Sequence, residues 1–405
     1  MGRKLDPASA REKRGQMRAT QAISIKPLRY NIDARMNRNM ATKVKEPVAA
    51  QAANAGSAAA KSNGSNGGNP LISNEKLKQL YSTMVKCRLL EERARSLKKQ
   101  ARFKGNYYAA VGQEAVAVAS GIDLRPEDTV APSHRDFILN FIKGVPLTAM
   151  FCQLYGRATS PDKGRSAPAH GGYAALNIIT PSSTIAAQLN IGTGIALANQ
   201  MKKNDNVVVA FSGEGSTSLG FWHEALNFAG VRNLPIVYVC QNNLWAESVS
   251  VKLQTKVDDM SLKAVGYGFP GITVDGNDAV AMYRVAQEAI ERARSGGGPT
   301  LIEAKTYRWY GHSEIDQAKY RTAEEVEEWK AKDPIAAMER YLTGKGLFSA
   351  GWKQQFTEEF QKELDAAVEV AEKAPPPEPI ECLDHLYSFD IRDRELDRKT
   401  YSPQF

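Results

Sequence analysis

The chain has 405 residues, 42% of them hydrophobic and 8% aromatic, which is enough for a large hydrophobic core. We expect neither a membrane-spanning protein nor a secreted one, because the sequence has no long apolar run and no apolar signal-peptide core. The net charge of +8 is concentrated near the N-terminus: residues 1–70 carry +9, which leaves −1 for residues 71–405 and gives nucleic-acid binding by that part no electrostatic support.

Residues 1–70 are predicted to form a disordered basic tail and linker. Residues 1–40 hold ten basic and three acidic residues, and residues 47–70 contain no aromatic residue with which to build a core. Four interpretations of the basic segment remain open: a solvated tail, a docking arm, an Arg-rich transit peptide, or an extension upstream of a start at Met36 or Met40. We expect a cytoplasmic protein, with the mitochondrial matrix as the alternative if the segment is a transit peptide.

Residues 71–345 are predicted to form an α/β domain with a parallel sheet flanked by helices. Helical spacing of apolar residues begins in EKLKQLYSTMVKCRLLEERARSL. Three short apolar runs are typical of buried strands: Val207–Phe211, Ile236–Cys240 and Thr300–Ile302. Helix-like segments such as WHEALNFAG separate them, and this alternation indicates a sheet covered on both faces. The pattern after Asp333–Pro334 is helical, so residues 346–405 are assigned to a helical C-terminal extension and tail.

A carboxylate between two glycines follows the first of these strands. In VVVAFSGEGSTSLG, Glu214 lies between Gly213 and Gly215, directly after the apolar run. Glycines at such a turn let backbone amides approach an anion closely. The spacing G-x-G-x-x-x-x-G does not match the dinucleotide fingerprint, and Phe221 stands where a Walker loop requires lysine, so both familiar phosphate motifs are excluded.

A pair of asparagines, Asn242 and Asn243, follows the second strand. The C-terminal ends of neighbouring parallel strands share one edge of a sheet, so Glu214 and Asn243 can converge there. A carboxylate and an amide oxygen suit a hard cation such as Mg²⁺, which keeps further positions for water and for phosphate oxygens. Each motif alone has a structural interpretation, because a glutamate can cap a helix and Asn-Asn can form a turn.

The segment SGEGSTSLGFWHEALNFAGVRNLPIVYVCQNN resembles the metal–diphosphate motif of thiamine-diphosphate enzymes. Most of residues 75–345 further resembles the alpha subunit of the decarboxylating first component of 2-oxo acid dehydrogenase complexes. The other segments that carry this resemblance, in the same order, are GQEA (112–115), HRD (134–136), KGRSAPAH (163–170), TYRWYGHS (306–313), YRT (320–322) and DPI (333–335). The resemblance implies the thiamine-diphosphate-binding fold and an oxidoreductase that decarboxylates a 2-oxo acid and transfers the acyl group to a lipoyl disulfide.

The resemblance also implies which residues hold thiamine diphosphate and Mg²⁺. Glu214 and Asn243 would bind the metal through their side chains, and Trp245 through its backbone carbonyl. The implied cofactor contacts are His134 and Arg135 near the diphosphate end, Gly213, Gly215 and Ser216 along the diphosphate, and Ser183 and Ile185 at the aminopyrimidine. His134 stands where relatives often have tyrosine.

Two loop histidines, His170 and His312, are the candidate catalytic residues. A loop histidine can titrate near neutral pH and exchange protons with a reacting carbonyl, although a lone one is more often only solvated. The resemblance is what favours the catalytic interpretation for both. His223 and His385 are assigned structural roles, and Ser313 matches a position that some relatives regulate by phosphorylation.

One part of the expected active site is missing from this chain. Activation of the cofactor requires a carboxylate that normally comes from a second α/β domain, and residues 71–405 contain only one such domain. The resemblance therefore implies a beta subunit, an assembly of two alpha and two beta chains, and a dihydrolipoyl acyltransferase as a further partner.

The substrate stays open at this point. Glu214 and KGRSAPAH resemble branched-chain 2-oxo acid members, whereas GQEA and the pair His134–Arg135 resemble pyruvate or acetoin members. Tyr107 and Tyr108 are candidates for the acyl pocket. The alternatives to a 2-oxo acid dehydrogenase are an acetoin-cleaving enzyme and a non-catalytic scaffold subunit.

Overall fold

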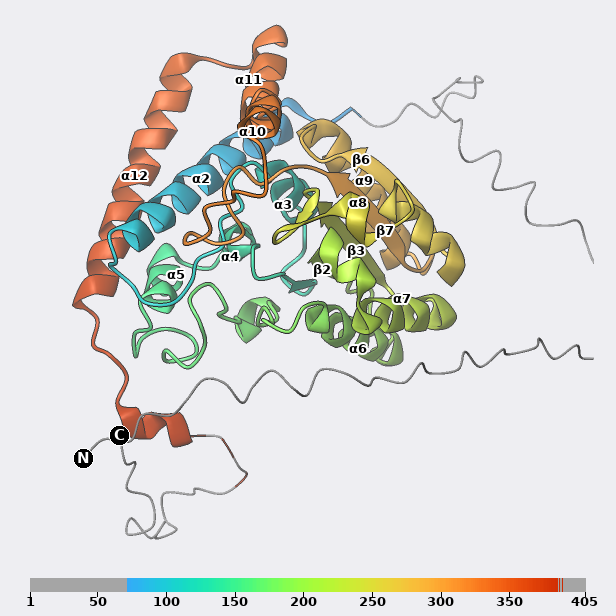
Figure 1. The fold of residues 1–405 in the computed structure, drawn as a ribbon, viewed down its shortest axis with the longest axis horizontal. Coiled ribbons are helices and arrows are strands. Elements are labelled where there is room, and N and C mark those ends of the chain that lie inside the picture. Colours follow the sequence, from blue (N-terminus) through green and yellow to red (C-terminus); the bar gives the residue numbers. More distant parts are fainter. Residues whose placement is uncertain (1–70, 385, 387, 389–405) are drawn as a thin grey trace, which may run out of the picture. The chain divides into compact units, whose positions relative to one another are not determined.

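The computed structural model in Figure 1 describes residues 71–384, 386 and 388. The chain divides into two units, Met1–Asn69 and Pro70–Phe405. The predicted disordered tail and His385 lie outside the described residues. The fold below is that of the second unit.

A five-stranded sheet in the order β1-β2-β3-β7-β6 forms the centre, and every pair of neighbours is parallel. Its strands are β1 (Thr129–Ala131), β2 (Val208–Gly213), β3 (Ile236–Asn242), β7 (Thr300–Lys305) and β6 (Gly271–Asp275). The predicted parallel sheet is confirmed, including the three strands expected from apolar runs. Two strands were not expected, because β1 has only three residues and β6 is largely exposed at the sheet edge.

Helices cover both faces of this sheet (Figure 1). Alternate residues of β2 separate the two layers, since successive side chains of a strand point to opposite faces. Val208 and Ala210 pack in the cluster that contains Trp222 of α7 (Gly220–Arg232), beside α6 (Ala187–Lys202). Val209 and Phe211 pack in the other cluster, which α2 (Asn74–Lys99), α3 (Glu114–Gly121) and α9 (Ala279–Arg294) also build. This burial on both sides explains the continuous apolar strands.

The helix boundaries follow local signals. Ser73 caps α2 by accepting a hydrogen bond from the Lys76 amide at 3.1 Å, and Asp333 caps the helix that begins at Pro334. The remaining helical elements are α4 (Phe137–Ile142), α5 (Leu147–Leu154), η2 (Ala174–Leu176), η3 (Glu214–Ser218), α8 (Val251–Gln254), η4 (Met260–Tyr267), α10 (Ala323–Lys330), α11 (Pro334–Gly344), α12 (Ala350–Lys373) and η5 (Pro379–Leu383). A short antiparallel pair, β4 (Trp245–Ala246) and β5 (Val249–Ser250), follows β3. Helix α12 packs against α2 and α5, and the domain boundary after residue 345 stays a prediction.

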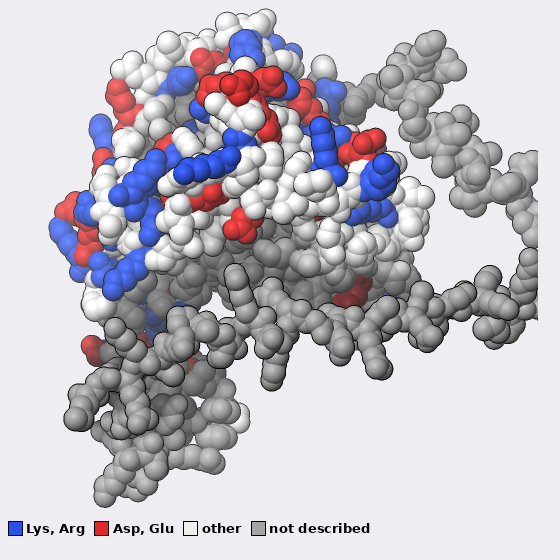
Figure 2. Space-filling view, viewed as in Figure 1, with Lys and Arg blue, Asp and Glu red and all other residues white. Residues whose placement is uncertain are grey.

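The surface carries both signs of charge. Figure 2 shows Lys and Arg side chains interspersed with Asp and Glu. Ion pairs such as Arg93–Asp365 (2.7 Å) and Lys353–Glu339 (2.7 Å) join neighbouring helices. Within the part of the chain that the structure describes, none of the helices is both long enough and apolar enough to cross a membrane.

Candidate active site

The ends of β2 and β3 bring Glu214 and Asn243 together. The two strands are parallel and in register, with Gly213 opposite Gln241, so the residues that follow them meet at one edge. The backbone amide of Asn243 donates to Glu214 Oε2 at 3.2 Å. The convergence that the two sequence motifs predict is therefore present in the structure.

Glu214 is a buried carboxyl group with an unsatisfied oxygen. Its side chain is 2% exposed, and Oε1 has no hydrogen-bond partner among the described residues. Burial raises the pKa of this carboxyl, while its bonds to backbone amides and the nearby Arg308 and Arg135 act in the opposite direction. A buried carboxylate in this state is stabilised by a bound cation, so the donor set fits a hard metal ion.

The predicted ligand set contains only one carboxylate. Within the described residues, no group of three or more His, Cys, Asp or Glu side chains is placed to hold a metal. An amide oxygen and a backbone carbonyl, from Asn243 and Trp245, complete the predicted set. Mg²⁺ accepts such a set because it keeps several waters or phosphate oxygens in its coordination shell.

The two glycines beside Glu214 serve different purposes. A side chain at Gly213 would meet nothing within 4 Å, so the backbone at the strand end is open to a ligand. A side chain at Gly215 would collide with the methyl group of Ala246. Gly213 therefore fits the predicted role of letting a ligand approach the backbone closely. Position 215 must be glycine because Ala246 of β4 packs directly against it.

A cavity of about 290 Å³ opens at this edge of the sheet. Ten of the twelve predicted site residues line it: His134, Arg135, Ile185, Gly213, Glu214, Gly215, Ser216, Asn243, Trp245 and His312. The other two, His170 and Ser183, do not line it and instead pair with each other beside it. Gln188 and Gln241 also line the cavity and were not predicted. Gln241 could have been found from its place at the strand end, whereas Gln188 has no local signal.

The tyrosines have different environments from those expected. Tyr107 is fully buried and its hydroxyl donates to Glu91 at 2.9 Å, and neither Tyr107 nor Tyr108 lines the cavity, so the structure does not bring the two candidates for the acyl pocket to its wall. Tyr108 contacts three histidine rings, with centroid distances of 4.8 Å to His134, 5.2 Å to His312 and 6.4 Å to His170. Tyr108 is therefore the side chain around which the predicted histidines gather.

Hydrogen bonds define opposite tautomers for the two candidate catalytic histidines. An arginine cannot accept a hydrogen bond, so the 3.3 Å contact from Arg135 to His312 Nδ1 leaves the ring proton of His312 on Nε2. His170 Nδ1 lies 2.8 Å from the Pro168 carbonyl and must donate to it. His170 Nε2 then accepts from the Ser183 hydroxyl at 3.1 Å. Neutral His312 is thus an N–H donor at Nε2, and His170 orients a serine hydroxyl.

The site carries fixed positive charge beside neutral imidazoles. Burial, followed by the charge of Arg135, places the pKa of His134 well below its ordinary value. Burial and the charges of Arg135 and Arg308 lower the pKa of His312 to about 4. Burial lowers the pKa of Arg135 to about 10, so this guanidinium is cationic at neutral pH. His312 therefore does not titrate near neutral pH in this structure, contrary to the sequence expectation, and the net field favours an anion.

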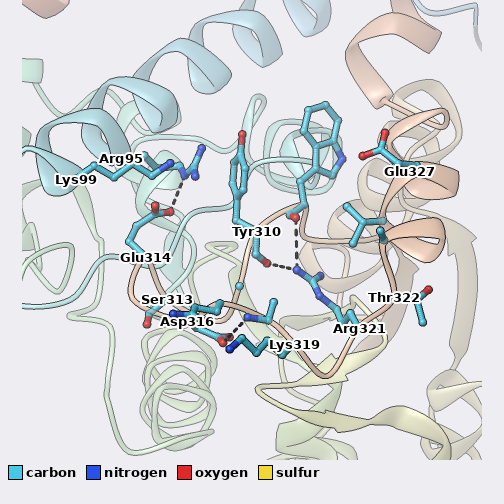
Figure 3. Close-up of a pocket in the computed structure, with 16 residues that line it drawn as sticks. Arg95, Lys99, Tyr310, Ser313, Glu314, Asp316, Lys319, Arg321, Thr322 and Glu327 are labelled. Carbon is cyan, nitrogen blue, oxygen red and sulfur yellow. Dashed lines mark hydrogen bonds and ion pairs between the residues drawn. The ribbon is translucent and has the colours of Figure 1, made fainter.

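Two buried arginines fasten the segment that carries His312. Arg308 donates to the carbonyl oxygens of Tyr310 (2.8 Å) and Glu247 (2.6 Å) and to the Tyr320 hydroxyl (2.9 Å). Arg321 donates to the carbonyl oxygens of Arg308 (2.7 Å) and Tyr310 (2.7 Å). Figure 3 shows Arg321 directed at Tyr310 in this segment. The segment is thereby tied both to itself and to the loop that follows β4.

A larger cleft of about 500 Å³, drawn in Figure 3, is lined by other residues of the same segment. Arg95 and Glu314 form an ion pair of 2.6 Å on its wall, and Ser313 also lines it. Neither Glu214 nor Asn243 reaches this cleft. The smaller cavity is therefore the better candidate for the chemistry.

Comparison with known proteins identifies the family. Residues 81–380 match the model of the "Dehydrogenase E1 component" family. The chain is 37% identical over 320 residues to the 2-oxoisovalerate dehydrogenase subunit alpha of Bacillus subtilis, an alignment that covers 78% of this chain and 97% of that protein. It is 34% identical over 317 residues to the alpha subunit of acetoin:2,6-dichlorophenolindophenol oxidoreductase of the same organism (78% and 95% covered).

A third relative is named for a different substrate, pyruvate. The chain is 35% identical over 320 residues to the pyruvate dehydrogenase E1 component subunit alpha of Staphylococcus epidermidis, with 78% of this chain and 84% of that protein covered. The identities to these three relatives differ little, so sequence similarity does not choose among their substrates. The chain belongs to the dehydrogenase E1 component family, that of the alpha subunits of 2-oxo acid dehydrogenases, as its sequence predicts.

Proposed function

We propose that this chain holds the metal–diphosphate end of thiamine diphosphate in an enzyme that oxidatively decarboxylates a 2-oxo acid. The family depends on this cofactor. The observation that carries the proposal for this chain is the buried, unpartnered Oε1 of Glu214, beside Asn243, in a cavity at the C-terminal edge of a parallel sheet. Glu214, Asn243 and the Trp245 carbonyl would hold Mg²⁺, and the open backbone at Gly213 would face the diphosphate.

Each neighbouring group has a definite task in this proposal. When bound, the cofactor supplies the carbanion chemistry and the electron sink for decarboxylation. Arg135 provides a fixed cation for an anionic ligand and, through its bond to Nδ1, keeps the proton of His312 on Nε2. His312 then offers a neutral N–H donor to the substrate oxygen, a role that does not require a cationic imidazole.

The substrate class proposed here is a 2-oxo acid, branched-chain or pyruvate. Acetoin cleavage is the second candidate, because one relative bears that activity in its name at nearly the same identity. A hydrophobic pocket separates substrates that differ by one methylene only about 10–200-fold. Steady-state rates with 2-oxoisovalerate, pyruvate and acetoin, measured on the assembled enzyme, decide among them. A chain that binds the cofactor but supports none of these reactions would favour the scaffold interpretation.

The proposed partners are a beta subunit, in an assembly of two alpha and two beta chains, and a dihydrolipoyl acyltransferase that accepts the acyl group. They are proposed because the relatives are named as alpha subunits and E1 components. The cavity residues of this chain also offer few carboxylates: among the described residues that line it, only Glu214 and Glu247 carry one.

The metal assignment is tested by replacing Glu214. We expect Glu214→Ala to abolish Mg²⁺-dependent binding of thiamine diphosphate and of inorganic pyrophosphate in calorimetric titrations, while the circular dichroism spectrum stays that of the wild type. Glu214→Asp should retain part of the affinity, because the donor remains a carboxylate. The matched control is Glu247→Ala, which removes an exposed carboxylate from the same cavity. Unchanged affinity in Glu214→Ala contradicts the assignment.

A further inference from the structure

The turn that follows β3 holds a leucine in a left-handed conformation. Leu244 has a φ of 71°, a region that residues with a side chain seldom occupy because their Cβ atom then comes close to a backbone carbonyl oxygen. Leu244 lies between Asn243 and Trp245, the two predicted metal ligands of this turn. Its conformation therefore decides how the Asn243 side chain and the Trp245 carbonyl are directed.

The side chain of Asn242 holds Leu244 in this conformation. Its Oδ1 accepts a hydrogen bond from the Leu244 amide at 3.1 Å. Because a backbone amide can only donate, Oδ1 must face Leu244 and the Nδ2 group of Asn242 must face away from it. Nδ2 donates to Glu303 Oε1 at 2.7 Å. A partner on each side thus sets the orientation of the Asn242 amide.

Glu303 is a buried carboxyl group on β7, the strand next to β3 in the sheet (Figure 1). Its side chain is 0% exposed. It pairs in register with Cys240, so its side chain lies on the same face of the sheet as that of Asn242. Its second oxygen, Oε2, accepts from the Ser261 amide at 3.2 Å and from the Thr273 hydroxyl at 3.1 Å. Both oxygens of Glu303 are therefore satisfied by donors.

This arrangement requires a side chain at position 303 that only accepts hydrogen bonds. A glutamine would present one acceptor and one donor, so its Nε2 would face either the Nδ2 group of Asn242 or the Ser261 amide. If the Asn242 amide turned to relieve that conflict, its Nδ2 would instead face the Leu244 amide. A buried donor that faces another donor loses its hydrogen bond and is costly. A carboxylate at position 303 avoids each of these conflicts.

Asp128 shows what a buried carboxylate does at the other end of the sheet. It is also 0% exposed and immediately precedes β1. It accepts from the Val207 amide at 2.9 Å and forms an ion pair of 2.7 Å with Arg294. None of these three residues lines the cavity. Asp128 therefore offers a matched comparison in which a buried carboxylate serves the fold and lies away from the strand ends that carry the metal ligands.

We infer that Glu303 is a positioning residue for the proposed metal site. It acts through the Asn242 amide, which holds the turn at Leu244. The turn in turn directs Asn243 and the Trp245 carbonyl toward the cation. Glu303 does not line the cavity and would not touch Mg²⁺ itself. This inference rests on the proposed function.

An isosteric replacement tests the inference. We expect Glu303→Gln, in the full chain, to weaken Mg²⁺-dependent binding of inorganic pyrophosphate about 10–100-fold in calorimetric titrations, the usual effect of losing a residue that orients a metal ligand. The matched control, Asp128→Asn, makes the same chemical change at an equally buried carboxyl group. It should lower the melting temperature and leave the affinity unchanged. Wild-type affinity in Glu303→Gln, or an equal loss in both variants, overturns the inference.

A reciprocal exchange restores the pattern of donors and acceptors. In the double variant Asn242→Asp with Glu303→Gln, the new carboxylate can accept from the Leu244 amide and from the new amide, whose oxygen can accept from Ser261. We expect its affinity to return close to that of the wild type, a strongly non-additive result. Asn242→Asp alone controls for the charge added near the metal and should weaken binding, because two carboxylates then face each other.

The double variant also decides the matter if Glu303→Gln alone does not fold. In that case the double variant should fold and should bind Mg²⁺ and inorganic pyrophosphate as the wild type does. A double variant that binds no better than either single variant, or that does not fold, overturns the inference.

Amide hydrogen exchange without added Mg²⁺ separates this inference from the proposed function. The Leu244 amide should exchange faster in Glu303→Gln than in the wild type, and at the wild-type rate in Asp128→Asn. Equal exchange in Glu303→Gln and in the wild type overturns the inference and leaves the metal site standing. A wild type that does not bind Mg²⁺ and pyrophosphate overturns the proposed function, whereas the faster exchange would still show that Glu303 holds the turn.

Discussion

At the scale of single residues, the neutrality of His312 is the feature that the sequence does not foresee. Its pKa falls to about 4 because the ring is largely buried and lies beside the charges of Arg135 and Arg308. The bond from Arg135 to Nδ1 further specifies which nitrogen keeps the proton. A histidine in this setting acts at neutral pH as a hydrogen-bond donor with a fixed direction, not as a reservoir of protons.

Replacing His312 should therefore affect turnover more than binding. We expect His312→Asn to lower kcat of the assembled enzyme by about 10²–10³-fold, the range for the loss of one positioned hydrogen-bond donor to a developing oxyanion. The affinity for thiamine diphosphate should barely change, because the metal and diphosphate contacts lie at other residues. Steady-state kinetics with calorimetric titration of the cofactor measure both quantities. Wild-type turnover in the variant would remove His312 from the mechanism.

The same variant should change the pH dependence of stability. The pKa of His312 is about 4 in the folded chain, against an ordinary value of 6.5. Its contribution to the free energy of unfolding is therefore complete above pH 6.5 and is lost as the pH falls toward 4, because the unfolded chain binds the proton first. Urea unfolding of the chain alone at pH 7 and pH 5 should thus show a smaller loss for His312→Asn than for the wild type. An equal loss of stability in His312→Asn and in the wild type would contradict this contribution.

At the scale of elements, the conformation of residues 306–322 depends on buried guanidinium groups. Arg308 is 1% exposed and bonds to two carbonyl oxygens and a hydroxyl group, with no carboxylate within ion-pair distance among the described residues. Asp316 holds the turn from the other side by accepting from the His312 amide at 2.7 Å and the Tyr320 hydroxyl at 2.6 Å. The position of His312 is thus set by this network and not by a regular helix or strand.

Arg308→Lys should loosen this segment although the charge is kept. A lysine has one nitrogen and cannot reproduce the planar, forked set of bonds that Arg308 makes. We expect a loss of about 1–3 kcal/mol in the free energy of unfolding and faster proteolysis within residues 306–322. Arg284→Lys, at an exposed position on α9, is the matched control. Equal cleavage rates in the two variants would show that Arg308 does not hold the segment.

At the scale of the whole molecule, the segment that matches the family lies within one structural unit of the chain. Residues 81–380 match the family, and Pro70–Phe405 forms one unit. The function therefore belongs to this part of the chain. The role of residues 1–70 and the cytoplasmic location stay predictions.

Removing residues 1–70 should leave the site intact. We expect the chain 71–405 to bind thiamine diphosphate with Mg²⁺ as the full chain does, and to support decarboxylation together with the proposed beta subunit. The reason is that residues 47–70 cannot contribute to a core and that every cavity residue lies after position 132. Calorimetric titration and a decarboxylation assay measure this. Loss of the partial reaction would place the N-terminal segment in the site.

Local patterns in the sequence determined the three inner strands of the sheet, β2, β3 and β7, the helices that cover it and the meeting of Glu214 with Asn243. They could do so because strand burial leaves a continuous apolar run, and because parallel strands necessarily end at one edge. Only the tertiary structure decided that Tyr107 faces the core, that His170 and Ser183 pair beside the cavity, and that His312 is neutral. Each of these depends on contacts across long separations, such as the 177 residues between Arg135 and His312. Burial and charge at such distances have no signature in the neighbouring sequence, because they arise only when the chain has packed.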